Sequence, residues 1–119
     1  MSSQSFNSPI GQIDVRELAR RMAEDRNTLQ LVDVREPEEL AIAQLDSFIN
    51  LPLSQFAAWS SDIQAHLDPN VETIVLCHHG VRSTQMCYWL LQQGFTQVKN
   101  VTGGIDAYST LVDSTVPHY

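Results

Sequence analysis

The stretch that decides the fold is Thr73-Ile74-Val75-Leu76-Cys77-His78-His79-Gly80-Val81-Arg82-Ser83-Thr84-Gln85. Its opening apolar run predicts a buried strand, residues 77–82 predict a loop, and Ser83 begins a helix. Backbone N–H groups converge at such a junction, and the helix directs the positive end of its dipole toward it. Both effects favour the thiolate of Cys77, which is the nucleophilic form of cysteine. Arg82 adds a fixed cation, so the loop is suited to hold a small anion against the sulfur.

The composition is that of one ordinary globular domain. The chain has 119 residues, of which 43% are hydrophobic and 18% are charged, and this length suffices to bury a single core. Its formal net charge of −7 argues against nucleic acid or an anionic membrane as the main partner. An anionic substrate would therefore be held by local cations and backbone dipoles against the overall charge of the protein.

Cysteine usage and the N-terminus favour a reducing compartment. The two cysteines, Cys77 and Cys87, do not form the disulfide framework of a small secreted domain. Residues 1–9 lack the apolar segment of a signal peptide, and no run approaches the roughly 20 apolar residues that span a bilayer. We therefore expect a cytoplasmic protein without membrane contact.

Predicted strands and helices alternate along the chain. Strands are expected at residues 29–34, 49–52, 72–76 and 97–101, and helices at residues 83–93 and 105–111 and from residues 15, 37 and 54 onward. This order predicts an α/β fold of three layers, with a mostly parallel central sheet and helices on both faces. Ligands of such sheets bind beyond the carboxyl ends of the strands, where Cys77 and the Asp33-Val34-Arg35 segment lie.

Three motifs resemble those of the single-domain rhodanese sulfurtransferases, in the order found in that family. They are Leu31-Val32-Asp33-Val34-Arg35-Glu36-Pro37-Glu38-Glu39, Cys77-His78-His79-Gly80-Val81-Arg82-Ser83 and Val101-Thr102-Gly103-Gly104-Ile105. The resemblance covers nearly the whole chain and implies a single rhodanese-like domain over residues 12–119. Residues 1–11 are rich in serine, asparagine and glutamine and are expected to form a flexible tail. The chain departs from the family pattern at residues 43–48, where two glycines and a histidine are usual, and at Tyr108, where a tryptophan is common.

The resemblance also implies a reaction. Cys77 would accept a sulfane sulfur and become a persulfide, whose outer sulfur is surrounded by the substrate-binding loop. That loop consists of His78, His79, Gly80, Val81, Arg82 and Ser83. A small anionic donor such as thiosulfate would release sulfite, and a thiol, cyanide or protein acceptor would take the sulfur in a second half-reaction. Such double displacement needs neither a metal nor an organic cofactor.

The length of the loop separates sulfur transfer from related chemistry. Four residues, 78–81, lie between Cys77 and Arg82, whereas the related phosphatases of the cell cycle have five at this place. The smaller ring of N–H groups suits a sulfur atom better than a phosphoryl group. We therefore rank sulfur transfer above phosphatase or arsenate reductase activity.

Each candidate residue also has a plainer interpretation. Cys77 could be an inert buried cysteine, although the surrounding loop argues against this. Cys87 lies in the middle of an apolar helix and is interpreted as a core residue rather than a resolving thiol for Cys77. Arg82 is expected to contact an anion, with a surface ion pair as the alternative. Adjacent histidines rarely converge on one tetrahedral metal, so His78 and His79 are interpreted as residues of the pocket mouth, with no metal.

Asp33 and Arg35 lie at the end of the predicted strand that precedes the helix at Pro37. Asp33 and Arg35 are expected to form an ion pair that braces the Cys77 loop from behind, and Glu38 or Glu39 could also pair with Arg35.

The leading alternative function is a rhodanese-fold sulfur-relay or protein-binding module with little turnover of thiosulfate.

Overall fold

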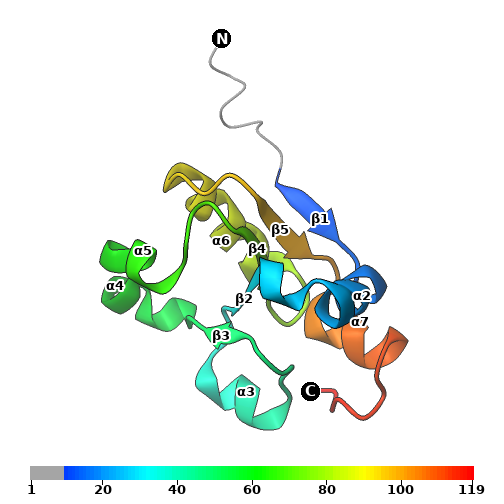
Figure 1. Ribbon diagram of the computed structural model, residues 1–119. Coiled ribbons are helices and arrows are strands. Elements are labelled where there is room, and N and C mark those ends of the chain that lie inside the picture. Colours follow the sequence, from blue (N-terminus) through cyan, green and yellow to red (C-terminus); the bar gives the residue numbers. More distant parts are fainter. Residues whose placement is uncertain (1–9) are drawn as a thin grey trace.

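Five strands form one sheet at the centre of the computed structural model, which describes residues 10–119 (Figure 1). They are β1 (Gly11–Ile13), β2 (Leu29–Asp33), β3 (Ile49–Asn50), β4 (Glu72–Leu76) and β5 (Val98–Val101). Their order across the sheet is β1-β5-β4-β2-β3, and every neighbouring pair is parallel. The predicted parallel α/β fold is confirmed, with β4 in the middle of the sheet.

Helices cover both faces of this sheet. The helices of the described residues are α2 (Val15–Glu24), α3 (Pro37–Ile42), α4 (Phe56–Trp59), α5 (Ile63–His66), α6 (Val81–Gln92) and α7 (Gly104–Leu111), and α3 alone among them has no residue in either core. Helices α2 and α7 pack on one face, and α4, α5 and α6 pack on the other (Figure 1). Within residues 10–119, none of these helices combines the length and the apolarity needed to cross a membrane.

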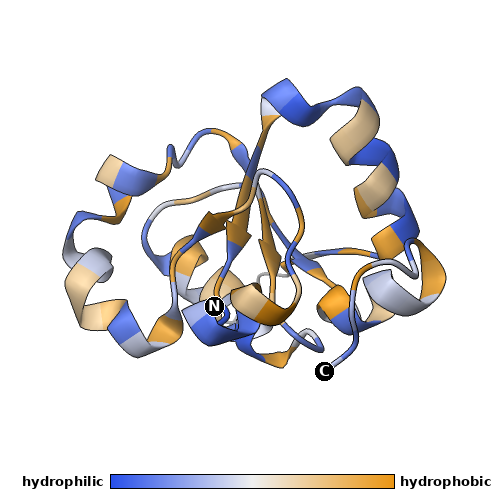
Figure 2. Ribbon diagram, turned by 90° about the horizontal axis from the view of Figure 1, so that it is seen from below, coloured by the Kyte–Doolittle hydropathy of each residue, from blue (hydrophilic) through white to orange (hydrophobic). Residues whose placement is uncertain are grey.

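Side chains of the central strand alternate between two hydrophobic cores. Ile74 and Leu76 belong to the core beneath α2 and α7, whereas Val75 and the following Cys77 belong to the core beneath α4, α5 and α6. Figure 2 shows the strands as mostly hydrophobic segments enclosed by the helices. Because both faces are covered, the strand is apolar without interruption, as parallel strands usually are.

Local signals in the sequence fix the start of two helices. The Asp14 side chain accepts a hydrogen bond of 2.8 Å from the N–H of Glu17 and thereby caps the N-terminus of α2. Helix α3 has Pro37 in its first turn, and Glu36 and Glu39 form a capping box around its first residues. The capping box of α3 also positions Glu39 for its contacts with Arg82 and Tyr119.

The predicted boundary of the N-terminal tail is two residues too late. Ile10 is 7% exposed, and Gly11–Ile13 pairs with β5 as an edge strand. A strand of three residues is too short to give a recognisable alternation in the sequence. The rest of the expected tail, residues 1–9, lies outside the described residues.

Two helix predictions also need correction. The helix expected from Ser54 onward is broken into α4 and α5 by a 3₁₀ turn at Ser60–Asp62, a run of serine and aspartate residues, whose helix propensity is lower than that of alanine or leucine. Ser54 itself lies in a 3₁₀ turn and donates its hydroxyl to Glu36. Helix α6 begins at Val81 rather than Ser83, because Gly80 adopts a left-handed conformation with φ of 102° and ends the loop early.

Candidate active site

The sulfur of Cys77 lies beneath the first turn of α6, where two backbone N–H donors and one hydroxyl group converge. Sγ is 3.0 Å from the backbone nitrogen of Gly80 and 3.3 Å from that of Ser83. The hydroxyl oxygen of Ser83 lies 3.1 Å from the same sulfur. Cys77 is only 1% exposed, so these donors act on it with little competition from water. Donors arranged in this way stabilise negative charge on the sulfur.

These donors are available because a helix leaves its first N–H groups without partners inside the helix. Residues 80–83 carry those groups in α6, and two of them, from Gly80 and Ser83, donate to Sγ. The N–H groups of Val81 and Arg82 donate to no acceptor among residues 10–119. They remain available for a negatively charged group attached to, or placed beside, the sulfur.

A second helix, α7, holds the loop from the opposite side. The N–H of Ile105 donates to the carbonyl of Cys77 over 2.9 Å, and the N–H of Asp106 donates to the carbonyl of His78 over 3.1 Å. A Cβ at Gly104 would lie 2.5 Å from the carbonyl oxygen of Cys77 and closer still to that of His78. Glycine is therefore required at position 104 for α7 to approach. Because C=O and N–H point in opposite directions across a planar peptide, the N–H groups of these peptides turn away from α7.

Behind the sulfur, Ser83 connects to the buried amide of Asn100 and through it to the exposed amide of Gln12. Its hydroxyl lies 2.5 Å from Oδ1 of Asn100, whose amide nitrogen donates to Gln12 over 3.1 Å. The hydroxyl has one proton. When Ser83 donates that proton to Asn100, it can accept the S–H of a neutral Cys77; when it donates to the sulfur, it stabilises the thiolate. Ser83 is thus suited to both protonation states of the cysteine.

Arg82, expected to contact an anion, is paired with Glu39. The guanidinium donates two hydrogen bonds to the carboxylate, Nη1 to Oε2 at 2.7 Å and Nη2 to Oε1 at 2.9 Å. The hydrogen bond from Arg82 lowers the pKa of Glu39 to about 2, and the carboxylate raises the pKa of Arg82. Anion binding by Arg82 stays a prediction, and such an anion would compete with Glu39 for the guanidinium.

Tyr119, which no motif in the sequence indicates, joins three parts of the site. Its hydroxyl accepts a hydrogen bond of 2.8 Å from Arg35 and donates one of 2.9 Å to Glu39. Its ring stacks on the ring of His78, with centroids 3.9 Å apart and planes 5° apart. The segment that carries Tyr119 therefore returns to the loop and to α3, beside which Figure 1 places the C-terminal end.

The ion pair expected at the end of β2 is present and fully buried. Nη2 of Arg35 lies 2.7 Å from Oδ2 of Asp33, and Nε lies 3.0 Å from Oδ1. Arg35 also donates to the carbonyl of Ala43 over 2.9 Å, just beyond the last turn of α3. Its side chain reaches the Cys77 loop through Tyr119, which makes the proposed bracing role indirect.

The two histidines of the loop stack against each other at its mouth. Their ring centroids are 3.9 Å apart, and burial, assisted by the neighbouring His79, lowers the pKa of His78. Nε2 of His78 is buried without a hydrogen-bond partner among the described residues. Asp106 of α7 approaches the pair, with Oδ2 at 3.9 Å from Nε2 of His79.

The second cysteine lies in the core. Cys87 is completely buried on α6, and this burial raises the pKa of its thiol to about 12, with a smaller contribution from Cys77. A thiol of this kind is almost entirely protonated near neutral pH and is a poor nucleophile. The interpretation of Cys87 as a packing residue stays the preferred one.

The chain is similar to several known proteins. The profile of the rhodanese-like domain matches residues 14–111, and the chain belongs to this family, in which sulfur transfer is the characteristic activity. It is 34% identical over 100 residues to a protein named "Sulfurtransferase" from Allochromatium vinosum, covering 84% of this chain and 89% of that protein. A solved rhodanese-like domain protein from Staphylococcus aureus superposes with a TM-score of 0.72 at 27% identity, covering 83% of this chain and 91% of that one.

A further relative corrects the expected location. The chain is 46% identical over 117 residues, 97% of its length, to the Arabidopsis thaliana "Rhodanese-like/PpiC domain-containing protein 12, chloroplastic", and it spans 39% of that protein. This relative contradicts the cytoplasmic location expected from the sequence. Targeting segments are separate from the folded domain that they deliver, so the composition of the domain could not reveal the compartment.

Proposed function

We propose that this chain is a sulfurtransferase in which Cys77 takes a sulfane sulfur from an anionic donor such as thiosulfate and holds it as a persulfide. A thiol, cyanide or protein acceptor then receives the sulfur. The observation that carries this proposal is the convergence of the Gly80 and Ser83 donors on Sγ, at 3.0 to 3.3 Å. Membership of the rhodanese-like family supports sulfur transfer as the kind of reaction.

In the first step the thiolate of Cys77 attacks the outer sulfur of thiosulfate. A new S–S bond forms, the S–S bond within thiosulfate breaks, and its electron pair leaves with sulfite. The persulfide that remains carries its negative charge on the outer sulfur. The unpaired N–H groups of Val81 and Arg82 are suited to stabilise that charge, because they belong to the positive end of α6.

In the second step an acceptor thiolate or cyanide attacks the outer sulfur. The S–S bond of the persulfide breaks, and its electron pair returns to Cys77 as the thiolate. The leaving group is therefore stabilised by the same donors, from Gly80 and Ser83, that hold Sγ at the start. One set of hydrogen bonds serves both half-reactions.

The number of free donors supports a single sulfur atom over a phosphoryl group as the bound species. Among residues 10–119, the N–H groups of Gly80 and Ser83 donate to Sγ, and those of Val81 and Arg82 have no acceptor outside α6. A terminal sulfur carries one charge at one atom, whereas a phosphoryl group presents three charged oxygens that need more donors.

A sulfur-relay module is the second candidate, and the ion pair between Arg82 and Glu39 favours it. Glu39 occupies the guanidinium through two hydrogen bonds, and the chain carries a net charge of −7. A dianion such as thiosulfate therefore meets no unpaired arginine at the loop. A persulfide delivered by a protein or small thiol would depend less on such a cation.

Intact-mass measurement after incubation with thiosulfate tests both candidates. We expect the protein to gain one sulfur atom that dithiothreitol removes. The gain should be absent in Cys77→Ser and retained in Cys87→Ala, which serves as the matched control for the other buried cysteine. Thiocyanate formation with cyanide then measures turnover.

Each outcome of this experiment is decisive. A removable sulfur with sustained turnover supports the thiosulfate sulfurtransferase, and a removable sulfur with negligible turnover supports the relay module. The proposal fails if neither thiosulfate nor a cysteine persulfide donor modifies Cys77, or if Cys77→Ser retains turnover. Hydrolysis of an aryl phosphate without any sulfur gain would indicate phosphatase chemistry instead.

A further inference from the structure

Three potential metal ligands meet at the mouth of the Cys77 loop. His78 and His79 belong to the loop, and Asp106 belongs to the first turn of α7. One ligand atom from each of the three lies within 4.8 Å of the other two. From the sequence alone, two adjacent histidines argue against a metal site. The sequence does not show that α7 brings the carboxylate of Asp106 to them.

His78 provides a ring nitrogen that the protein leaves unused. Its Nε2 is buried and has no hydrogen-bond partner among residues 10–119, although buried nitrogen atoms nearly always have one. The His79 ring lies against that of His78, with planes 27° apart. The His79 side chain is 59% exposed, so it can rotate toward its neighbour at little cost in packing.

Asp106 is oriented toward the histidines by two contacts. Its backbone N–H donates to the carbonyl of His78 over 3.1 Å, and its Oδ1 lies 3.2 Å from Nδ1 of His118. Its other oxygen, Oδ2, lies 3.9 Å from Nε2 of His79. Carboxylates that bind metals in proteins are usually held by a hydrogen bond from a neighbouring group, and His118 can supply that bond here.

We propose that His78, His79 and Asp106 bind a divalent transition metal ion of the zinc class, with His118 orienting the carboxylate. Two imidazole nitrogens and one carboxylate oxygen are ligands that Zn²⁺ prefers, and three protein ligands leave a fourth position open. Ligand atoms of tetrahedral zinc lie about 3.3 Å apart, so rotation of the exposed His79 side chain must shorten the present separations. The proposal does not depend on the sulfurtransferase assignment, because metal binding can be measured without turnover.

Zinc titration of untagged protein in the Cys77→Ser background tests the site, since the thiolate cannot then supply a ligand. We expect one equivalent of Zn²⁺ to bind, measured by competition with a chromophoric chelator, and one equivalent of Co²⁺ to give the visible absorption of a tetrahedral site. His79→Ala and Asp106→Asn should each weaken binding by more than about tenfold, and His118→Ala by about tenfold.

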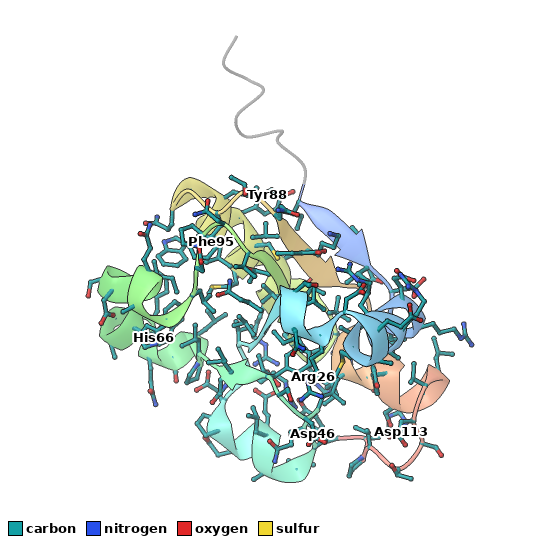
Figure 3. The ribbon with its side chains drawn as sticks, viewed as in Figure 1. Arg26, Asp46, His66, Tyr88, Phe95 and Asp113 are labelled. Carbon is teal, nitrogen blue, oxygen red and sulfur yellow. The ribbon has the colours of Figure 1, made fainter. Side chains whose placement is uncertain are left out.

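His66→Ala is the matched control. His66 also lies near an aspartate, Asp62, at 3.6 Å, but it belongs to α5, which Figure 3 shows on the side of the molecule away from the segment that carries Asp113. Its replacement should leave zinc affinity unchanged. The melting temperature of each variant without metal, and its rise with zinc, separates lost binding from lost folding. If Asp106→Asn does not fold, His79→Ala decides, because that side chain is largely exposed.

Two results would overturn the proposal. Equal zinc affinity in the His79, Asp106 and His66 variants would mean that surface histidines bind the ion non-specifically. Binding by the wild-type protein that disappears in Cys77→Ser would mean that the thiolate, rather than the histidine and aspartate cluster, holds the metal.

Discussion

Glu39 binds Arg82 through two hydrogen bonds of 2.7 and 2.9 Å, so the one arginine of the Cys77 loop is occupied before any substrate arrives. The carboxylate comes from α3 and the guanidinium from α6, two helices that begin beyond the neighbouring strands β2 and β4. This pair makes the charge of the loop nearly neutral. It also makes the use of an anionic donor depend on whether the pair can open.

Glu39→Gln is therefore expected to improve the use of thiosulfate. The amide cannot neutralise Arg82, so the KM for the anionic donor should fall severalfold, while Arg82→Ala should raise it by roughly tenfold or more, as loss of a charged hydrogen-bond donor does. Steady-state kinetics with thiosulfate and cyanide measures both. Glu38→Gln is the control, because Glu38 is exposed on the same helix. An unchanged KM in Glu39→Gln and in Arg82→Ala would assign the pair a purely structural role.

Ser83→Ala tests the hydroxyl beside the sulfur. Losing one hydrogen bond to Sγ should lower the rate of persulfide formation by about fivefold to tenfold, which stopped-flow or quenched mass measurements can follow. Ser109→Ala is the matched control, because Ser109 is equally buried and its hydroxyl bonds to the carbonyl of Val116. Both variants should lose some stability, but only Ser83→Ala should react more slowly. Equal rates would remove the hydroxyl from the mechanism.

Gly104 and Gly94 form a natural pair for testing how α7 fixes the loop. Both have positive φ, 61° and 94°. A methyl group at Gly104 would collide with the backbone of Cys77 and His78, whereas one at Gly94 would meet nothing within 4 Å. Urea unfolding should show a loss of about 1–2 kcal/mol for Gly94→Ala, which reflects backbone strain alone. Gly104→Ala should lose clearly more and should also lose activity; equal losses would show that the loop and α7 can separate easily.

Much of the fold, and the centre of the site, could be predicted because their signals are local. The apolar run of β4, the left-handed Gly80 and the helix that follows lie within a few residues of Cys77. Strand β1 could not be predicted, since three residues carry no clear pattern. The break between α4 and α5 falls at Ser60–Asp62, whose lower helix propensity is too weak a signal to locate the end of a helix from the sequence.

The outer part of the site could not be predicted because distant segments assemble it. Glu39 and Tyr119 meet Arg82 and His78 only through the tertiary fold. Asn100 did carry a signal, since it lies two residues after Val98 in a predicted strand and so shares its face, where a polar side chain needs a buried partner; that partner is Ser83. No motif marks the segment that carries Tyr119.

Tyr119→Phe and Tyr119→Ala separate the hydroxyl of this residue from its ring. The phenylalanine variant keeps the stack on His78 but leaves a donor of the buried Arg35 without its partner, which should cost about 1–3 kcal/mol in free energy of unfolding. The alanine variant should lose more, because the stack is also lost. Tyr88→Phe on α6, whose position Figure 3 labels, is the control and should change little. No difference between Tyr119→Phe and Tyr88→Phe would show that solvent replaces the hydroxyl.

Acid should destabilise the protein through Glu72, at the start of β4. Hydrogen bonds from Arg21, at 2.7 and 3.1 Å, and a contact with Lys99 lower the pKa of this carboxyl from 4.5 to about 2. Because the pKa of Glu72 is lower in the folded than in the unfolded protein, its contribution is complete above about pH 4.5. It is lost as the pH falls toward 2 and amounts to at most about 3 kcal/mol.

Glu72→Gln should therefore flatten the decline of stability between pH 5 and pH 2, measured by urea unfolding at each pH. The amide cannot be protonated in this range, so the variant begins less stable at pH 7 and approaches the wild type in acid. Glu38→Gln, which changes an exposed carboxyl, should follow the wild-type curve. A Glu72→Gln curve parallel to that of the wild type at every pH would mean that the ion cluster around Glu72 adds no pH-dependent stability to the fold.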